Sequence, residues 1–103
     1  MRPTIKMRNR RRGDVLTVRA LIRHPMAISR RNKETGKYSQ GHYIQEVDCL
    51  LNGELVMHAD WGQGVSKNPY LSFRIHGVSK GDHLLLRWRD NQGGSDELEK
   101  EIG

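Results

Sequence analysis

The sequence has few cysteines for crosslinks, no long apolar run for a membrane helix, and few aromatic residues for stacking on bases. It contains one cysteine, three prolines and six aromatic residues among 103 residues, and its apolar fraction is 35%. A single cysteine excludes an internal disulfide, so the fold must be held by packing alone. No run approaches the roughly 18 uncharged apolar residues that a membrane helix needs. The length and composition predict one domain, residues 1–103, with a thin core.

A secretory leader is also not recognisable. Arg10-Arg11-Arg12 resembles a twin-arginine start, but Asp14, Arg19 and Arg23 interrupt the apolar region that should follow it. We therefore expect a chain without a leader of its own.

The net charge of +6 is distributed unevenly. Residues 1–12 form a basic N-terminal segment with six Arg and Lys side chains and no acid, whereas residues 90–103 are mainly acidic. Basic stretches can contact nucleic-acid phosphates, but among residues 27–42 only Tyr38 offers an aromatic ring for base stacking. We expect a solvated basic face, or one that meets an acidic protein, and no nucleic-acid partner.

The clearest structural signal is the dipeptide Asn52-Gly53 between two runs rich in Val, Leu and Ile. These two residues readily take positive φ in a type I′ turn, which is the strongest short-range signal for a β-hairpin. The period-2 alternation on either side, 43–51 and 54–60, predicts strands with one face in a core and one in water.

Similar alternation predicts further strands at 15–23, 70–76, 83–89 and 95–102. Ile5 and Met7 indicate a short edge strand, followed by a basic turn that ends at Gly13-Asp14. Residues 27–42 are polar and basic, and are typical of a long loop or a β excursion. About seven short strands without helical periodicity predict an all-β protein, a two-sheet antiparallel β-sandwich.

The histidines and the cysteine raise the question of a metal site. Four His and one Cys hold non-haem iron in some β-sandwich proteins, so an iron-binding superoxide reductase-like protein is one alternative. However, the five histidines are scattered in sequence, without a short ligand motif. We interpret them as surface side chains and predict no metal site and no cofactor.

The sequence shows no catalytic motif, so we predict that the protein is not an enzyme. Cys49 lies between inward-facing Val47 and Leu51 with no cationic neighbour, which indicates a buried, inert thiol. Asp48 and Asp60 are interpreted as solvated acids on strand faces.

Two short segments are candidates for contact with a partner. His24-Pro25-Met26 ends a strand with an apparently exposed methionine, and Asn68-Pro69-Tyr70 forms a corner before the next strand. A turn or loop closure explains each segment equally simply. We predict partner binding by His24, Pro25, Met26, Asn68, Pro69 and Tyr70.

Several motifs, in order along residues 13–102, resemble the SoxZ family. They are Leu21-Ile22-x-His24-Pro25-Met26, a loop centred on Gly36, Cys49 before Asn52-Gly53, Val56-x-x-Ala59-Asp60, Asn68-Pro69-Tyr70-Leu71-x-Phe73 and Trp88-x-Asp90-x-x-Gly93. Residues 27–42 depart from the family pattern, which leaves a SoxYZ-like carrier of another redox pathway as an alternative.

The resemblance implies an immunoglobulin-like β-sandwich and a non-catalytic role in bacterial thiosulfate oxidation. A SoxZ subunit pairs with SoxY as a heterodimer or heterotetramer, the SoxYZ sulfur carrier. SoxY carries sulfur intermediates on the cysteine of its Gly-flanked arm and presents them to other Sox enzymes. The family works in the periplasm, so the resemblance implies export together with a signal-bearing SoxY.

Overall fold

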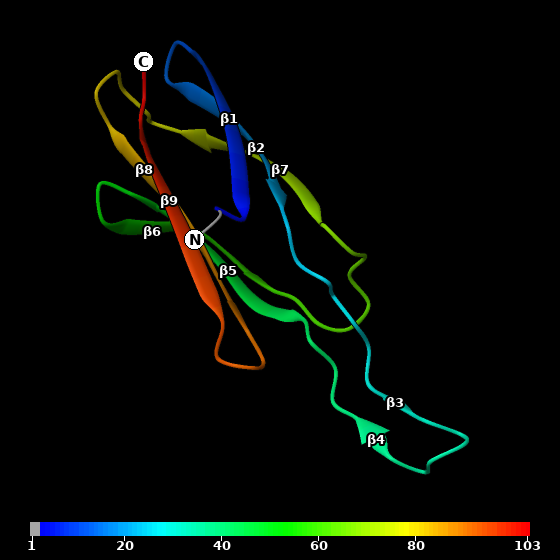
Figure 1. Cartoon of the computed structure of the whole chain (residues 1–103). Coiled ribbons are helices and arrows are strands. Elements are labelled where there is room, and N and C mark those ends of the chain that lie inside the picture. Colours follow the sequence, from blue (N-terminus) through cyan, green and yellow to red (C-terminus); the bar gives the residue numbers. More distant parts are fainter. Residues whose placement is uncertain (1–2) are drawn as a thin grey trace.

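A computed structural model describes residues 3–103. These residues form nine β-strands and no helix (Figure 1). The strands are β1 (Ile5–Arg12), β2 (Val15–Ile22), β3 (Arg30–Arg31), β4 (Tyr38–Ser39), β5 (Ile44–Leu51), β6 (Glu54–Asp60), β7 (Tyr70–His76), β8 (His83–Asp90) and β9 (Ser95–Glu101). Within residues 3–103 no helix is long and apolar enough to cross a membrane.

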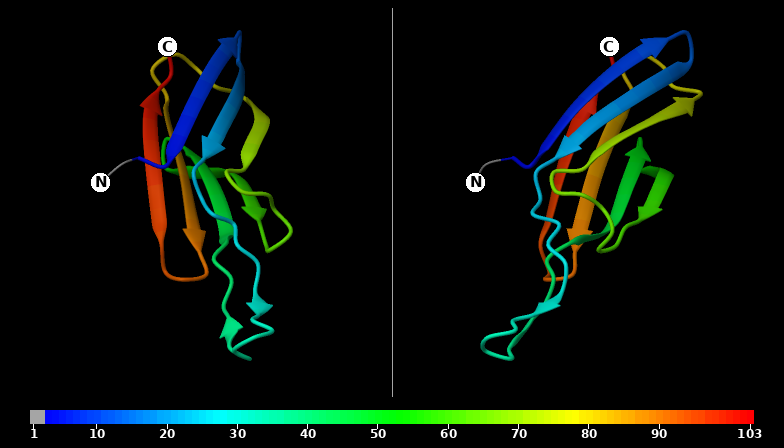
Figure 2. Two further views of the ribbon diagram at one scale, coloured as in Figure 1. Left: turned by 45° about the vertical axis from the view of Figure 1, so that its right-hand side comes forward. Right: turned by 90° about the vertical axis from the view of Figure 1, so that its right-hand side faces the viewer.

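The seven long strands form two antiparallel sheets that pack face to face (Figure 2). One sheet has the strand order β1-β2-β7 and the other β6-β5-β8-β9. The short strands β3 and β4 pair only with each other. This arrangement confirms the predicted all-β antiparallel sandwich.

The core lies between the two sheets and is filled by alternate residues of each strand. In β2 the side chains of Leu16, Val18, Ala20 and Ile22 are all buried, as the alternation predicted. From the opposite sheet, β8 contributes three more residues to this core: Leu84, Leu86 and Trp88. Removing these apolar surfaces from water is the main force that holds the sheets together.

The turn at Asn52-Gly53 joins β5 to β6 as predicted. Asn52 and Gly53 have φ of 50° and 84°, and Leu51 pairs directly with Glu54. Both central residues therefore have the positive φ that a type I′ turn requires, a backbone region that glycine enters without steric cost.

The N-terminal basic segment differs from the prediction. Instead of a short strand and a basic turn, β1 runs for eight residues and pairs with β2 along its whole length, from Ile5–Ile22 to Arg12–Val15. Only Gly13 and Asp14 are left for the turn. Arginine is tolerated in the strand because alternate side chains point to solvent, where a charge costs little.

Residues 27–42 form a β excursion that stands away from the sandwich (Figures 1 and 2). An isolated bridge joins Ala27 to His42 at its base, and β3 pairs with β4 further out. Every residue from 30 to 40 is exposed. The excursion contributes to a molecule that is 58 Å long but only 24 by 20 Å across.

Candidate functional site around Asp90

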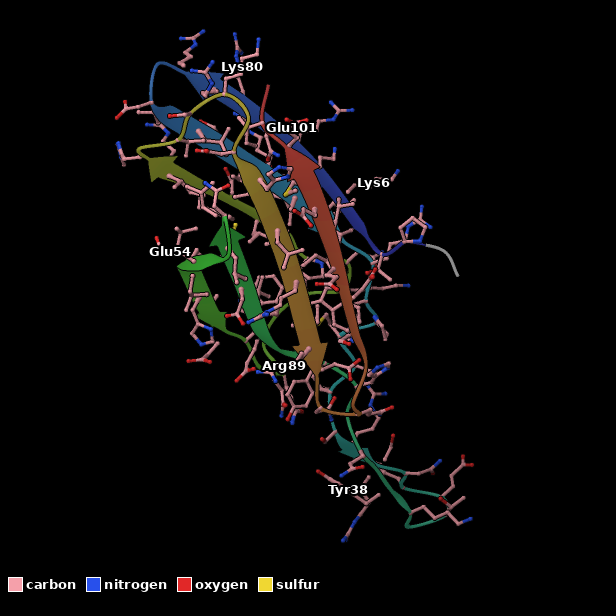
Figure 3. The ribbon with its side chains drawn as sticks, turned by 90° about the vertical axis from the view of Figure 1, so that its left-hand side faces the viewer. Lys6, Tyr38, Glu54, Lys80, Arg89 and Glu101 are labelled. Atoms are coloured by element: carbon pink, nitrogen blue, oxygen red, sulfur yellow. The ribbon has the colours of Figure 1, made fainter. Side chains whose placement is uncertain are left out.

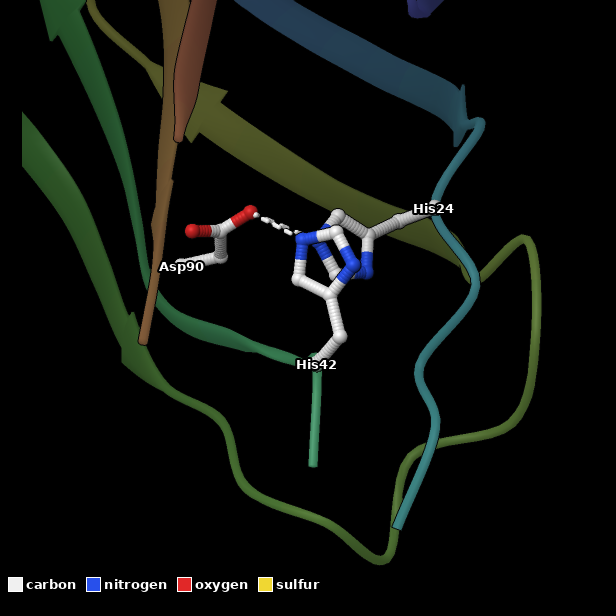
Figure 4. Close-up of side chains that lie close together, drawn as sticks. All are labelled: His24, His42 and Asp90. Carbon is white, nitrogen blue, oxygen red and sulfur yellow. Dashed lines mark hydrogen bonds and ion pairs between the residues drawn. The ribbon is translucent and has the colours of Figure 1, made fainter. Parts of the chain in front are cut away.

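Asp90 lies at the end of β8, and its carboxylate is buried where the excursion joins the sandwich. Oδ1 accepts hydrogen bonds from the backbone N–H groups of Gln92 (3.0 Å) and Gly94 (2.7 Å). Oδ2 lies 3.0 Å from Nε2 of His24 and 2.8 Å from Nε2 of His42 (Figure 4). A Cβ atom at position 94 would lie 2.6 Å from Oδ2, so glycine allows the turn to close over the carboxylate.

These contacts decide the charge of Asp90. Burial alone would raise its pKa, but the hydrogen bonds from His24, Gly94, His42 and Gln92 outweigh burial and lower the pKa to about 2. Asp90 is therefore a buried carboxylate that is ionised at neutral pH and satisfied on both oxygens.

His24 connects this carboxylate to the end of β2. Its Nδ1 accepts the backbone N–H of Met26 (3.1 Å), so the proton of the neutral ring must be on Nε2, which then donates to Asp90. The ring is 4% exposed and packs edge-on against Trp88, with ring centroids 5.1 Å apart. His24 is thus held in one tautomer and one orientation.

His24, His42 and Asp90 are residue types that bind metals, but their hydrogen bonds are those of a group that stabilises the fold. The ligand atoms of His24, His42 and Asp90 lie within 4.8 Å of one another. A metal bound to Nε2 of His24 would require the proton of the neutral ring to move to Nδ1, where it would face the N–H of Met26. Cys49 is not in this group, so it does not form the four-His, one-Cys site of the superoxide reductase-like alternative.

The interpretation of all five histidines as surface side chains was wrong for His24, which is buried, and for His42, which is half-buried. Their partner Asp90 is 66 and 48 residues away, respectively. The available signal was the turn sequence after Asp90, since an aspartate before Gly-rich residues commonly binds backbone N–H groups.

The two predicted partner-binding segments lie side by side. The N–H of His24 donates to Oδ1 of Asn68 (3.1 Å), and the N–H of Asn68 donates to the carbonyl of His24 (3.0 Å). The N–H of Ile22 donates to the carbonyl of Pro69 (3.0 Å). Asn68 has a φ of 50°, which turns the chain towards His24. The sequence motifs therefore mark one continuous region.

Only half of the six predicted side chains are on the surface. Pro25, Asn68 and Tyr70 are exposed, whereas His24, Met26 and Pro69 are buried. The expectation of an exposed Met26 was wrong: it is 5% exposed, and its sulfur accepts the N–H of Ile44 (3.3 Å). Partner binding by the six residues stays a prediction.

Tyr70 has an apolar neighbour that the sequence did not single out. It pairs with Leu21 across the β2–β7 ladder, so the two side chains lie on the same outer face. Tyr70 is 62% and Leu21 39% exposed. We call Leu21, Pro25 and Tyr70 the apolar corner.

Cys49 is completely buried in β5, as predicted. Burial raises the pKa of its thiol to about 12. The thiolate, which is the reactive form, is therefore negligible at neutral pH.

Asp48, on the neighbouring position of β5, differs from the prediction of a solvated acid. It is 7% exposed because His58 and Arg87 cover it. Nδ1 of His58 lies 2.5 Å from Asp48, and Nε2 lies 2.8 Å from Asp60, which is exposed as predicted. Burial would raise the pKa of Asp48, but the hydrogen bonds from His58 and Arg87 lower it. This group is a charge-compensated part of the outer sheet face.

One family of known proteins matches most of this chain. The sequence of residues 5–101 matches the family described as "Sulphur oxidation protein SoxZ". A comparison with curated proteins gave no match. The matched region includes both sheets, the excursion and Asp90, and it confirms the resemblance seen in the motifs. The chain therefore belongs to the SoxZ family of sulphur oxidation proteins.

Proposed function

We propose that this chain is the non-catalytic subunit that binds SoxY to form a SoxYZ sulfur carrier. In this role it supports SoxY while SoxY presents thiol-bound sulfur intermediates to Sox enzymes during thiosulfate oxidation. The observation that carries the proposal is the family match over nearly the whole chain, residues 5–101. Membership in this family makes the protein a component of sulfur oxidation, and the partner and the carrier role are our inference.

The burial of Cys49 favours a structural role for this chain over a role as the sulfur carrier. A sulfur carrier needs an accessible thiolate to form an adduct. Cys49 is the one cysteine of the sequence, and it is buried in the core with a pKa raised to about 12. The sulfur intermediate would therefore be held by the partner.

The apolar corner is the surface that we propose for SoxY. Exposed aromatic and aliphatic side chains are enriched at protein interfaces, because their burial contributes most of the binding energy. Leu21 and Tyr70 are adjacent, and Pro25 lies three residues after the end of β2. The excursion begins next to this corner and adds exposed Ile28 and Tyr38.

The Asp90 cluster gives this surface its rigidity. His24 ties the corner to β8, and His42 ties the returning end of the excursion to the same carboxylate. Both ends of residues 24–42 are thereby fixed, which lowers the conformational entropy lost when a partner binds.

The proposal extends to assembly and place of work. The pair would be a heterodimer, able to associate further into a heterotetramer. It would act in the periplasm after export together with a signal-bearing SoxY.

Co-expression with SoxY, followed by affinity purification at increasing salt, tests the pairing. We expect the wild-type chain and a Leu55→Glu control to co-purify with SoxY, since Leu55 is exposed on the other sheet. Tyr70→Glu should lose SoxY, because a carboxylate would replace an aromatic ring at the apolar corner. A wild-type chain that never retains SoxY would contradict the proposal.

The same experiment tests three claims separately: that the chain pairs with SoxY, that the apolar corner forms the interface, and that the complex acts in thiosulfate oxidation. If wild type and Tyr70→Glu pair equally well, the interface lies elsewhere and the assignment of the corner is wrong. If the complex forms but does not support thiosulfate turnover, the chain serves a carrier of another redox pathway.

A further inference from the structure

The outer face of the β1-β2-β7 sheet carries a concentration of positive charge. Alternate residues of each strand point outward there, and none of these positions holds an acid. The cationic side chains are Lys6, Arg8, Arg10 and Arg12 of β1, Arg19 of β2 and Arg74 of β7. We call these six residues the arginine face.

The strand register brings these side chains together in rows. Arg8 is directly opposite Arg19, and Arg10 is opposite Thr17, which is in turn opposite Arg74. Neighbouring strands are about 4.8 Å apart, so each row places two guanidinium groups within reach of one ligand surface. A shallow groove runs between them over Thr17 and Val15.

The charges of this face have no partner within the described chain. The ion pairs among residues 3–103 include none of the six cations. The outer face of the other sheet is different, because Arg87 pairs with Asp48 and Arg89 pairs with Glu46. Figure 3 shows Arg89 near one end of β8 and Glu101 near the opposite end of β9, the acidic strand that pairs with β8.

Like charges on directly opposite strand residues destabilise a sheet. The pairing of Arg8 with Arg19 thus works against folding, and an anionic ligand would relieve it. Guanidinium groups bind carboxylates through two parallel hydrogen bonds, so a row of arginines suits a surface rich in Asp and Glu. We propose that the arginine face is a docking surface for an acidic protein, bound transiently.

Two features favour an acidic protein over nucleic acid. Tyr70 is the one Tyr, Phe or Trp at the outward positions of the three strands, and it lies at the end of the face, so the face has no row of large aromatic rings on which successive bases could stack. The face is also a sheet of three strands, whereas readers of duplex grooves insert a helix or a two-stranded ribbon.

The same charge density favours a transient contact over a permanent one. Complementary charges at an interface raise the rate of association and the specificity more than they raise the affinity. The apolar corner is suited to the permanent partner, and the arginine face to proteins that the assembled carrier visits. This division of surfaces rests on the proposed carrier role.

A charge-reversed variant tests the face directly. The probe is a fluorescent 20-residue poly-L-glutamate peptide, and anisotropy measures its affinity for the chain in about 0.05 M and about 0.3 M salt. We expect Arg10→Glu/Arg74→Glu to weaken binding about tenfold at low salt and to reduce the salt dependence. The matched control Arg30→Glu/Arg31→Glu changes net charge equally on the excursion, and it should bind nearly as wild type does.

A second variant shows whether weaker binding could result from loss of folding. Arg8→Gln/Arg19→Gln removes a repulsive pair, so it should fold at least as stably as wild type and still bind the peptide more weakly. Equal losses in the excursion control would show that net charge alone attracts the peptide, and would overturn the proposal. Tighter wild-type binding to a 20-base-pair DNA duplex through the same arginines would overturn it in favour of nucleic acid.

The test also distinguishes this inference from the proposed function. The arginine-face variants should still co-purify with SoxY, since they leave the apolar corner intact. If they lose SoxY while the Leu55→Glu control keeps it, the face belongs to the permanent interface and the transient assignment is wrong. Peptide binding by the isolated chain can be measured whether or not SoxY binds.

Discussion

Replacing Asp90 with asparagine removes the charge that joins β2, β8 and the excursion, with almost no change in volume. The amide oxygen can still accept the N–H groups of Gln92 and Gly94. The amide nitrogen, however, would face the Nε2–H of His24 and the ring of His42. His24 cannot reverse its tautomer without losing the N–H of Met26. Two hydrogen bonds to a carboxylate are lost, and one buried donor is left without an acceptor.

The size of the effect follows from these contacts. Hydrogen bonds to a charged group contribute about 1.5–3 kcal/mol each when buried, and less where water can replace the partner, as at half-exposed His42. We therefore expect Asp90→Asn to lower the free energy of unfolding by about 3 kcal/mol. For a domain of this size, that corresponds to a fall in Tm of roughly 10–20 °C.

The lowered pKa of Asp90 arises from the same contacts and makes the stabilisation depend on pH. A fall from 3.8 to about 2 corresponds to roughly 2 kcal/mol of stabilisation by the ionised form. Because the folded-state pKa is lower than the unfolded value, this stabilisation is complete above pH 3.8 and is lost as the pH falls through about 2. The difference between wild type and Asp90→Asn should therefore shrink at low pH.

Urea unfolding followed by far-UV circular dichroism measures both effects. Asp14→Asn is the control, since Asp14 is exposed in the turn before β2, and it should change stability by less than about 0.5 kcal/mol. If Asp90→Asn were as stable as this control at pH 7, or if its deficit did not depend on pH, the Asp90 cluster would not hold the fold as described.

Two further predictions concern Cys49 and His58. The Cys49 thiol should react with a disulfide reagent only as fast as the chain unfolds. Cys49→Ser should leave pairing with SoxY and thiosulfate turnover of the complex nearly intact. Loss of turnover in a variant that folds and pairs would contradict the interpretation of Cys49 as an inert thiol. Hydrogen bonds that His58 donates to Asp48 and Asp60 raise its pKa, although burial opposes them. NMR titration should therefore find the pKa of His58 above 6.5, and find it lower in Asp48→Asn. Because the folded-state pKa is raised, the stabilisation by His58 is present below pH 6.5 and is lost as the pH rises through the folded value. An unchanged His58 titration in Asp48→Asn would refute this coupling.

The corrections to the sequence analysis share a physical cause. Alternation assigned Asp48 to the outer face correctly, but it could not show that His58 and Arg87, from neighbouring strands, cover it there. Met26 follows a strand and a proline, where no periodicity applies, and only the path of the chain back to Ile44 buries it. Exposure depends on what packs above a residue, and a local pattern carries no information on that.

By itself, the sequence determined six of the seven long strands, the hairpin at Asn52-Gly53, the buried Cys49 and the family. These follow from a period of two, from the φ preferences of two residues and from motifs that are short in sequence, and all of them are local. The tertiary structure alone decided that His24 and His42 meet Asp90, and that the cations of β1, β2 and β7 gather on one face. Such contacts depend on strand order and on register between segments far apart in the chain, which pairing of the sheets fixes and local preferences do not.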